Sequence, residues 1–550
     1  MVAVSSSPSK VRGADILAKA LEAAGVKNIY TLSGNHIMPV FDAALDSPLR
    51  LFHVRHEAAA VHMADAAARL TGNVAVAMVT GGPGHANAVS AMYTALQSES
   101  PVLLLSGHAP LNQLGKGAFQ EMDQASVAAP CVKASLIAKS TATLAHDIAN
   151  AVRIARSGRP GPVALSLPQD VLDGMADAAA QNVSAKDFQP EAIAPTSADI
   201  RTLLAAVSAA RAPLVLTGPQ LMQPAHQAAV QQCRATLGVP VIGMESPRGI
   251  NDPGLGSFPS LLLQSDVVVL VGKKIDFTLK FGDAAIFSPS AKFVVVDAEE
   301  NVLSHARKVL GDRLLAAIHA DAPSLVAALV ASNASASSAH ADWVAQAQTT
   351  IDFEPANWTD LATAEGNPMH AIALLKPFAE IAKTREVILI ADGGEFGQWA
   401  QAIVKTPIRV VNGMAGAIGG ATPFAIGAAI ERPDALVVAF MGDGAFGFHP
   451  SEFDTAVRYG VKMICVVGND CCWNAEYQIQ LRTYGEARLT GCELLPVEYD
   501  KVAKAFGADG ITVRTPVQAQ SAAQAAVAAS GPYCINGFIS KSAAPAVKML

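Results

Sequence analysis

Two acidic residues occupy positions where carboxylates could bind a hard metal ion. Asp443 follows the apolar run 435–441 within a Gly-Asp-Gly tripeptide, and Asp470 follows the apolar run 463–467. The tripeptide alone could be an ordinary tight turn. Both runs are predicted strands of one sheet, however, so the two carboxylates would meet at its carboxyl edge. Carboxylates suit Mg²⁺ or Ca²⁺ and leave room for phosphate oxygens, which predicts a site for a divalent ion and a phosphate-bearing ligand.

A third acidic residue, Glu57, stands where a strand is predicted to pass into a helix. The apolar run 51–54 precedes it, and the Ala-rich stretch 58–70 follows it. One interpretation is structural, because a glutamate at a helix N-terminus is stabilised by the helix dipole. The other is a chemical role for this carboxyl group, which the residue type alone does not specify. The residue types alone leave both interpretations open.

Two glycine-rich loops mark places where the backbone can approach a ligand closely. Residues 81–84 read Gly-Gly-Pro-Gly after the predicted strand 74–79, and residues 413–420 contain four glycines after the predicted strand 408–411. The second loop has a structural alternative, which is close packing of a helix.

Strands and helices alternate along almost the whole chain. This pattern predicts βαβ units and parallel sheets, which is an α/β fold. The first and third groups of strands share a plan of strand, Gly-rich loop, helix and strand, which indicates an internal repeat. The expected strands are residues 28–32, 51–54, 74–79, 101–105 and 163–167, then 213–216, 239–242, 267–271 and 293–296, then 386–390, 408–411, 435–441, 463–467 and 533–538.

The length of 550 residues predicts roughly three domains of about 150–200 residues. Residues 189–198 are rich in Pro, Ala and Ser, and residues 331–341 are rich in Ser, Ala and Asn, so both are predicted linkers. We therefore expect domains over 1–185, 190–345 and 355–550.

Composition excludes several classes of protein. The net charge of −7 provides no basic surface for nucleic acid or an anionic membrane. The apolar windows are interrupted by Gly, Pro or charged residues before they reach membrane-spanning length. The first twelve residues are Ser-rich and lack the apolar core of a signal peptide. We therefore expect a cytoplasmic protein with a small-molecule substrate, without a nucleic-acid or membrane partner.

The cysteines and histidines do not form a metal or redox motif. Seven cysteines occur without a Cys-x-x-Cys pair, and this odd number indicates a reducing compartment. The spacings of His36, His56, His85 and His449 fit no compact zinc motif, so we interpret these residues as ordinary polar side chains.

The segment from Gly442 to Trp473 resembles the thiamin-diphosphate fingerprint, which is Gly-Asp-Gly, a spacer of fewer than thirty residues, and a pair of Asn or Asp residues. The resemblance covers essentially the whole chain and points to the acetolactate synthase, benzaldehyde lyase and 2-hydroxyacyl-CoA lyase group. It implies three doubly wound parallel-sheet domains, which are a pyrimidine-binding domain (1–185), a middle domain (190–345) and a diphosphate- and metal-binding domain (355–550). It also implies a homodimer or homotetramer with active sites at the subunit interface.

The resemblance implies which residues hold the metal and the diphosphate. Mg²⁺ or Ca²⁺ would be bound by Asp443, Asp470 and the carbonyl of Cys472. Relatives often carry Asn in place of Asp470, which makes Asn469 an alternative ligand. The other residues implied to bind the cofactor in this domain are Gly394, Glu395, Gly416, Ile418, Gly442, Gly444, Ala445, Trp473 and Asn474.

The resemblance also implies roles in catalysis. Glu57 would hydrogen-bond a pyrimidine nitrogen of the cofactor, with Pro83 and Asn87 nearby. Ile418 would separate the two cofactor rings, and the Gly416 carbonyl would hold the exocyclic amine. The implied residues of the substrate side are Gln120, Ser33 and Asn35, and Ser33 has the alternative of being a simple turn residue.

The implied activity is C–C bond cleavage or formation on 2-oxo acids or 2-hydroxy ketones, as in acetolactate synthase or benzaldehyde lyase. A 2-hydroxyacyl-CoA lyase or oxalyl-CoA decarboxylase is the second alternative, and a non-catalytic subunit that only binds a partner is the third. FAD-containing synthases carry Gly-Ala-Arg-Phe where this chain has Gly-Lys-Lys-Ile at 272–275, which argues against bound FAD.

Overall fold

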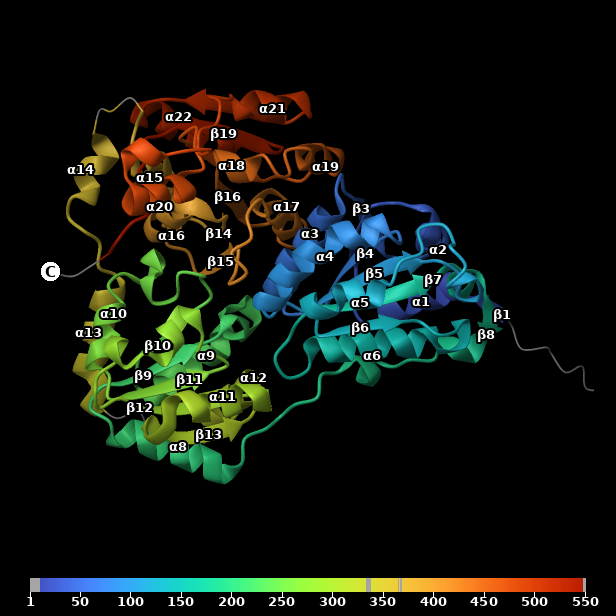
Figure 1. Ribbon diagram of the computed structural model, residues 1–550, viewed down its shortest axis with the longest axis horizontal. Helices are drawn as coiled ribbons and strands as arrows, with labels where there is room; N and C mark the ends of the chain where they lie inside the picture. Colours follow the sequence, from blue (N-terminus) through green and yellow to red (C-terminus); the bar gives the residue numbers. More distant parts are fainter. Residues whose placement is uncertain (1–9, 333–337, 365, 367, 548–550) are drawn as a thin grey trace, which may run out of the picture. The chain divides into compact units, whose positions relative to one another are not determined.

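A computed structural model describes residues 10–332, 338–364, 366 and 368–547. The chain forms two compact units, Met1–Glu191 (the N-terminal unit) and Ala192–Leu550 (the C-terminal unit). Figure 1 shows helices on both faces of the larger sheets, so the predicted α/β fold with doubly wound parallel sheets is confirmed.

The N-terminal unit is built on a six-stranded parallel sheet, the first sheet, with strand order β3-β2-β4-β5-β7-β6. The same unit also contains an antiparallel pair of strands, β1 (Lys10–Arg12) and β8 (Met175–Asp177). The strands are β2 (Asn28–Thr31), β3 (Arg50–His53), β4 (Ala75–Val79), β5 (Val102–His108), β6 (Ala134–Ile137) and β7 (Val163–Pro168). The helices are α1 (Gly13–Ala23), α2 (Met38–Ala43), α3 (Glu57–Thr71), α4 (Pro83–Gln97), α5 (Gln124–Ala128), α6 (Leu144–Arg156) and α7 (Gln169–Asp173).

The C-terminal unit contains a five-stranded parallel sheet, the middle sheet, with order β10-β9-β11-β12-β13. Apolar cores lie on both of its faces, as expected for continuous Val- and Leu-rich strands. The strands are β9 (Pro213–Thr217), β10 (Val241–Gly243), β11 (Val267–Val271), β12 (Lys292–Asp297) and β13 (Leu314–His319). The helices are α8 (Ser197–Ala209), α9 (Pro224–Leu237), α10 (Pro259–Gln264), α11 (Glu300–Leu310), α12 (Ala322–Ala331), α13 (Ala341–Ile351) and α14 (Trp358–Thr363).

The same unit contains a six-stranded parallel sheet, the last sheet, with order β15-β14-β16-β17-β19-β18. The strands are β14 (Val387–Ala391), β15 (Ile408–Val411), β16 (Leu436–Gly442), β17 (Ile464–Asn469), β18 (Asp509–Val513) and β19 (Tyr533–Phe538). The helices are α15 (Ala371–Ala382), α16 (Gly394–Ile403), α17 (Ala421–Glu431), α18 (Asp443–Phe446), α19 (Glu452–Arg458), α20 (Asn474–Tyr484), α21 (Tyr499–Ala505) and α22 (Pro516–Ala528).

The two predicted linkers can be compared with the structure. Residues 189–196 have no helix or strand, whereas the second predicted linker falls partly outside the described residues.

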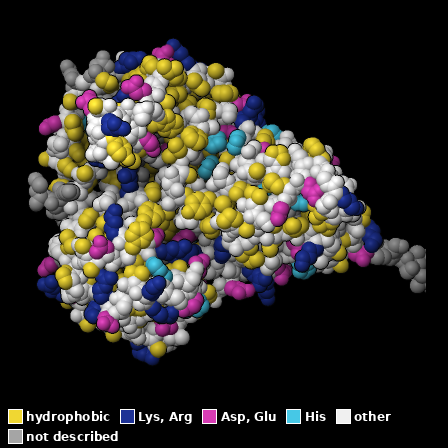
Figure 2. Space-filling model, in the orientation of Figure 1, with side chains coloured by type: hydrophobic (Ala, Val, Ile, Leu, Met, Phe, Trp, Pro, Cys, Tyr) yellow, Lys and Arg dark blue, Asp and Glu magenta, His cyan; other side chains and the backbone are white. Residues whose placement is uncertain are grey.

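No helix in the described part of the chain is both long and apolar enough to cross a bilayer. On the face drawn in Figure 2, the coloured Lys and Arg side chains are scattered among Asp and Glu.

Candidate active site

In the N-terminal unit, the Glu57 carboxylate lies at the carboxyl edge of the first sheet, at the first residue of α3. It is 8% exposed, and its Oε2 accepts a hydrogen bond from Nδ2 of Asn87 at 3.1 Å. Gly84 leaves room here, because a Cβ at that position would lie 3.5 Å from Glu57 Oε1 and 2.8 Å from a methyl carbon of Thr80. Two residues predicted to bind the cofactor are thus brought together.

The loop before α4 requires glycine at position 82. Gly82 has a φ of +59°, and a Cβ there would lie 2.8 Å from the carbonyl oxygen of Gln120. Glycine adopts such a conformation without a steric penalty. The Gly82 N–H donates to Oε1 of Gln124 at 2.9 Å, and the exposed Pro83 then begins α4. The predicted residues Pro83 and Gln120 therefore lie on segments that pack at the same edge.

Gln120 is presented by a loop that Glu121 organises. Gln120 has a φ of +56°, which is uncommon outside glycine and is often found at functional sites. The Glu121 carboxylate accepts hydrogen bonds from the backbone N–H groups of Gly115, Gly117 and Ala118, the last two at 3.0 and 2.9 Å. These hydrogen bonds, that of Gly115 first, lower the pKa of Glu121. Glu121 therefore shapes the loop, a role that sequence reasoning did not assign.

Ser33 and Asn35 follow β2 and are exposed at the same edge. The Ser33 hydroxyl hydrogen-bonds Nε2 of His53 at 2.8 Å. A Cβ on the intervening Gly34 would lie 2.4 Å from Cβ of Thr80, so this loop packs against the loop before α4. The structure thus gathers the predicted residues of the N-terminal unit at one edge.

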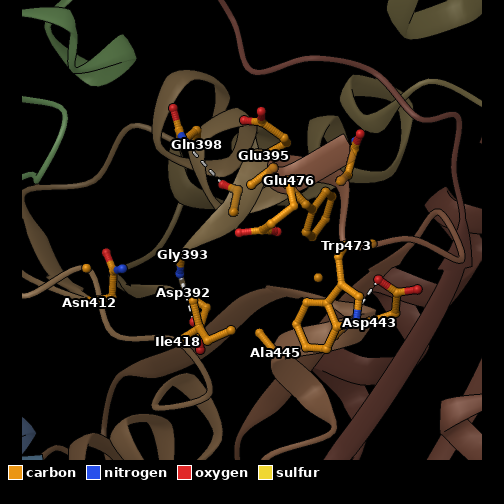
Figure 3. Close-up of a pocket in the computed structure, with 18 of the residues that line it drawn as sticks. Asp392, Gly393, Glu395, Gln398, Asn412, Ile418, Asp443, Ala445, Trp473 and Glu476 are labelled. Atoms are coloured by element: carbon orange, nitrogen blue, oxygen red, sulfur yellow. Dashed lines mark hydrogen bonds between the residues drawn. The ribbon is translucent and has the colours of Figure 1, made fainter. Parts of the chain in front are cut away.

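The C-terminal unit contains a cavity of about 380 Å³ at the carboxyl edge of the last sheet (Figure 3). It is lined by residues that follow several strands of this sheet and by the segment 246–248, which follows β10. The predicted residues that line it are Gly394, Glu395, Gly416, Ile418, Gly442, Asp443, Gly444, Ala445, Asp470, Cys472, Trp473 and Asn474.

Asp443 is the first residue of α18, directly after β16. Its carboxylate is buried and accepts hydrogen bonds from the N–H groups of Gly444 at 3.0 Å and Cys472 at 3.2 Å. Burial nevertheless raises the pKa of Asp443 to about 6. A Cβ on Gly444 would lie 2.4 Å from the Trp473 ring, so only glycine allows the two loops to approach this closely.

Asp470 follows β17, which pairs with β16 in the sheet. Burial raises the pKa of Asp470 to about 8, and the charge of Asp443 is the next cause. A later segment of the chain holds the loop that carries Asp470, because the Leu494 N–H donates to the Cys471 carbonyl at 2.8 Å. Two buried carboxylates that disfavour each other's charge are a favourable place for a cation.

The structure argues against Asn469 as an alternative metal ligand. Its side chain is fully buried and donates to the Val497 carbonyl at 2.8 Å and to Oδ1 of Asn536 at 3.0 Å. Of Asn469 and Asp470, it is Asp470 that lines the cavity.

Asp392 and Asn412 fix the turn that carries Ile418. The buried Asp392 carboxylate accepts hydrogen bonds from the N–H groups of Gly419 and Ala421, both at 2.9 Å. The Asn412 amide donates to a carbonyl of the same turn at 2.9 Å. Burial raises the pKa of Asp392 to about 6, although the hydrogen bonds oppose this shift. Hydrogen bonds to Asp392 and Asn412 therefore hold the turn that carries Ile418, the residue predicted to separate the two cofactor rings.

Arg248 reaches the cavity from the segment after β10. Its Nη2 lies 3.5 Å from Oε2 of the buried Glu395. Arg409 anchors this segment, because its guanidinium donates to Glu245 at 2.6 Å and lies 3.4 Å from Asp252. Among the described residues that line the cavity, Arg248 is the one Lys or Arg side chain. The middle sheet therefore supplies a cation to a site built mainly on the last sheet.

Sequence reasoning missed several residues of the cavity. Asn412 directly follows the predicted strand 408–411, so the rule that ligands bind at the carboxyl ends of strands could have found it. Arg248 gave no local signal, because it belongs to a different sheet. The missed lining residues include Arg248, Gln398, Gln401, Asn412 and Glu476.

The cavity fits a diphosphate held through a divalent ion. The described residues contain no group of three or more His, Cys, Asp or Glu side chains arranged to hold a metal ion by themselves. Mg²⁺, however, is typically bound by one or two carboxylates together with phosphate oxygens and water. Asp443 and Asp470 supply two carboxylates, and a Cβ on Gly442 would have no atom within 4 Å, so open space adjoins them.

Comparison with known proteins agrees with this geometry. Residues 11–127 match the family described as thiamine pyrophosphate enzyme, N-terminal TPP binding domain, and residues 392–536 match the corresponding C-terminal TPP binding domain. A probable acetolactate synthase of Mycobacterium bovis is 29% identical, covering 96% of both chains. A catabolic acetolactate synthase of Raoultella terrigena is 30% identical, covering 95% of this chain and 94% of its own. Human 2-hydroxyacyl-CoA lyase 2 is 31% identical, covering 91% of this chain and 84% of its own.

The chain belongs to the thiamine pyrophosphate enzymes. The resemblance drawn from the fingerprint is thereby confirmed, and with it thiamine pyrophosphate as the cofactor. The chain is an enzyme, and the alternative of a non-catalytic subunit finds no support in these relatives.

Proposed function

We propose that this protein cleaves or forms C–C bonds of 2-oxo acids or 2-hydroxy ketones, with Mg²⁺ holding the cofactor diphosphate. The observation that carries the proposal is the pair of buried carboxylates, Asp443 and Asp470, on neighbouring strand ends of the cavity. When bound, thiamine pyrophosphate supplies a carbon nucleophile and an electron sink. The residues of this chain bind it, orient it and hold the protons.

Mg²⁺ would be bound by Asp443, Asp470 and the carbonyl of Cys472. Cation binding would remove the mutual repulsion of the two buried carboxylates. The Asp443 hydrogen bond from the Cys472 N–H holds that loop against α18, so the ligands are oriented before a metal arrives. Ca²⁺ would suit the same oxygen donors at longer distances.

Glu57 would hold a proton at a ring nitrogen of the cofactor. Its carboxylate is largely shielded from water. Asn87 orients it by donating a hydrogen bond to Oε2, the other carboxylate oxygen being Oε1. Such a carboxylate can share a proton with a weakly basic nitrogen. Gln120, Ser33 and Asn35 would face the substrate from the same edge.

We further propose a homodimer or homotetramer with each site completed at a subunit interface. The support is that each unit carries only part of the cofactor-binding set. Mixed dimers of Glu57→Gln and Asp443→Ala chains would then contain one intact site. Equal mixing should restore about a quarter of wild-type activity, since half of the dimers are mixed and each has one site of two. No recovery after verified subunit exchange would contradict a shared site.

The reaction is tested by incubating the purified protein with thiamine pyrophosphate and Mg²⁺ against a substrate panel. Pyruvate, benzoylformate and benzoin represent the proposed classes, and both CO₂ and aldehyde are measured. We expect turnover of at least one of them that disappears when EDTA removes the metal. Turnover that does not depend on the cofactor or the metal would contradict the proposal.

A second candidate, a coenzyme A thioester substrate, is favoured by one observation. A cavity of about 420 Å³ lies beside the first and shares Arg248 and Glu395 with it. Lys280 and Arg482 also line it, so three cations face one carboxylate. Cations arranged in this way attract phosphate groups. 2-Hydroxyacyl-CoA and oxalyl-CoA therefore belong in the panel, and exclusive turnover of these substrates would favour the second candidate.

Two further proposals concern the flavin and the compartment. We propose that FAD is not bound, because Lys273 is buried and donates to Thr278 within the protein at 2.5 Å. A flavin absorbance in the purified protein would contradict this. We propose a cytoplasmic location, because all seven cysteines carry free thiols, which suits a reducing compartment.

A further inference from the structure

Glu395 has a carboxylate oxygen that the described part of the chain does not satisfy. Glu395 is the second residue of α16, and it is only 6% exposed. Its Oε2 is buried and accepts no hydrogen bond from any residue that the structure describes. Buried polar atoms in native proteins nearly always have a hydrogen-bond partner. The free oxygen therefore points to a donor that comes from outside the chain.

Glu395 lies at the boundary between two cavities. It lines the cavity of about 380 Å³ that contains Asp443 and Asp470, and also the neighbouring cavity of about 420 Å³. In the view of Figure 3, Glu395 lies across the first cavity from Ile418 and Ala445. A ligand that occupies the space between the two cavities would therefore contact Glu395. The residues that line both cavities are Pro247, Arg248, Glu395 and Gln398.

The charges around Glu395 match its own charge without occupying the free oxygen. Arg248 Nη2 lies 3.5 Å from Oε2, which is an ion pair without a hydrogen bond. Burial is the main cause that raises the pKa of Glu395, and Arg248, Arg482 and the Ala544 N–H oppose this shift, whereas the charge of Glu476 adds to it. The pair of Glu395 and Arg248 therefore carries no net charge when both side chains are ionised.

Both members of this pair are held in position by the fold. Arg409 donates to Glu245 at 2.6 Å and lies 3.4 Å from Asp252, so it anchors the segment that carries Arg248 at both ends. Glu395 lies in the first turn of a ten-residue helix. A site that selects a ligand through one hydrogen bond needs this kind of rigid support.

The free oxygen can distinguish the two proposed classes of substrate. An ionised carboxylate only accepts hydrogen bonds. The carboxylate of a 2-oxo acid is itself an acceptor with a negative charge, and the cofactor diphosphate is too, so neither satisfies Oε2. The hydroxyl group of a 2-hydroxy ketone is a donor. A hydrogen bond from a hydroxyl to a charged oxygen is among the stronger kinds.

We infer that Glu395 is a specificity-determining residue that accepts a hydrogen bond from the substrate hydroxyl and repels the carboxylate of a 2-oxo acid. The inference rests on the proposed function and deepens it, because it selects 2-hydroxy ketones from the two classes named there. Arg248 acts through Glu395, since an arginine that is already paired has no excess charge for a substrate carboxylate. 2-Hydroxyacyl thioesters carry the same hydroxyl group, and the substrate panel above distinguishes them from 2-hydroxy ketones.

The first test measures binding without turnover, so it separates failure of this inference from failure of the proposed function. The protein is loaded with Mg²⁺ and thiamin thiazolone diphosphate, an unreactive cofactor analogue. Calorimetry then compares benzoin with deoxybenzoin and acetoin with 2-butanone, because the second compound of each pair lacks the hydroxyl. We expect wild type to prefer at least one hydroxylated compound by at least ~10-fold, and Glu395→Met to prefer it by less than about threefold.

The control for this test is Glu486→Gln, which changes an exposed glutamate and should behave as wild type. A preference that persists in Glu395→Met would overturn the inference. A wild type that does not distinguish the compounds of either pair, including the case in which none of them binds, would overturn it as well.

The second test measures the charge of the pair with benzoylformate, a 2-oxo acid, on the same loaded protein. Glu395→Gln should bind benzoylformate at least ~10-fold more tightly than wild type, because Arg248 then has an unpaired positive charge. Adding Arg248→Gln to this variant should reverse the gain. Affinity for the cofactor analogue, measured first, should change less than about threefold in Glu395→Gln. Equal benzoylformate affinity in wild type and Glu395→Gln would overturn the inference, and so would a gain that persists without Arg248.

Discussion

The first sheet and the last sheet arrange their six strands in the same way. Numbered by position in the chain, the order in both is second, first, third, fourth, sixth, fifth. In both, glycine lies between the third strand and the next helix: Gly81 and Gly82 precede α4, and Gly442 ends β16 directly before α18. The predicted internal repeat is therefore present in the topology, although the sequence indicated it only through a shared plan of elements.

The two carboxyl edges nevertheless carry different chemistry. After the third strand of the first sheet the next helix begins with Pro83, whereas after the third strand of the last sheet it begins with Asp443. The fourth strand of the last sheet adds Asp470, whereas the other carboxylate described at the first edge, Glu121, accepts hydrogen bonds from its own loop. In the proposed function, one scaffold would serve for proton transfer at one edge and for binding a metal and a diphosphate at the other. The difference lies in a few residues at strand ends.

The largest expected effect comes from removing the carboxylate of the first edge. Glu57→Gln should lower turnover by about 10³-fold, because it cannot share a proton, and leave metal-dependent cofactor binding within about threefold. The measurements are kcat, calorimetric affinity and exchange of the proton on the reactive ring carbon by NMR. Glu191→Gln, an exposed position of the same unit, is the control. Near-normal turnover would contradict the proposal that the first edge provides proton transfer.

The carboxylate of the other edge should act on binding. Asp443→Ala should weaken Mg²⁺-dependent cofactor binding at least ~100-fold, since breaking a buried charge pair costs about 3 kcal/mol. Calorimetry with and without Mg²⁺ measures this, with the exposed Asp434→Asn as control. If affinity were unchanged and only turnover fell, both edges would serve the same step and the comparison would fail.

The two edges should also respond oppositely to acid, beginning with a loss in the N-terminal unit. Burial lowers the pKa of His62 in α3 to about 3. The unfolded chain binds this proton below pH 6.5 and the folded chain does not, so stability falls as pH drops below 6.5. From pH 7 to pH 5 the loss is about 2 kcal/mol. Hydrogen exchange of α3, corrected for intrinsic rates, measures it, and His62→Gln should flatten the dependence. An equally steep dependence in that variant would contradict the assignment to His62.

The smallest expected effect has the opposite sign and lies in the last sheet. Burial raises the pKa of Asp392 to about 6. Between its unfolded value and pH 6 the folded state holds the proton, so acidification from pH 7 to pH 5 should stabilise the turn 416–421 by about 1 kcal/mol. Hydrogen exchange of this turn should slow relative to α3. If both segments lost protection together, a common unfolding event would explain the response, and the contrast would be lost.

The sequence predicted the interior of each sheet and one of its two edge strands, and it missed the other edge strand. Val267–Val271 and Tyr533–Phe538 lie inside their sheets and have the predicted bounds, because strands buried on both faces read as continuous apolar runs. The edge strand Ile408–Val411 also has the predicted bounds. The strands β6, β13 and β18 were not predicted, and each lies at the other edge of its sheet. These three strands are partly exposed, so their residues are mixed and give no clear run. The antiparallel pair of β1 and β8 was also not predicted, because the two strands lie far apart in the chain.

The amino-acid sequence by itself determined the class of the protein and the residues at the ends of its buried strands. Asp443, Asp470, Glu57 and the glycine loops could be found because strand ends are local features, written in contiguous residues. Tertiary structure decided the rest. It turned Asn469 away from the cavity, brought Arg248 to it from another sheet, and placed Glu476 in its lining. These outcomes depend on which side chains already satisfy one another across the fold, and that is set by packing between segments distant in the chain.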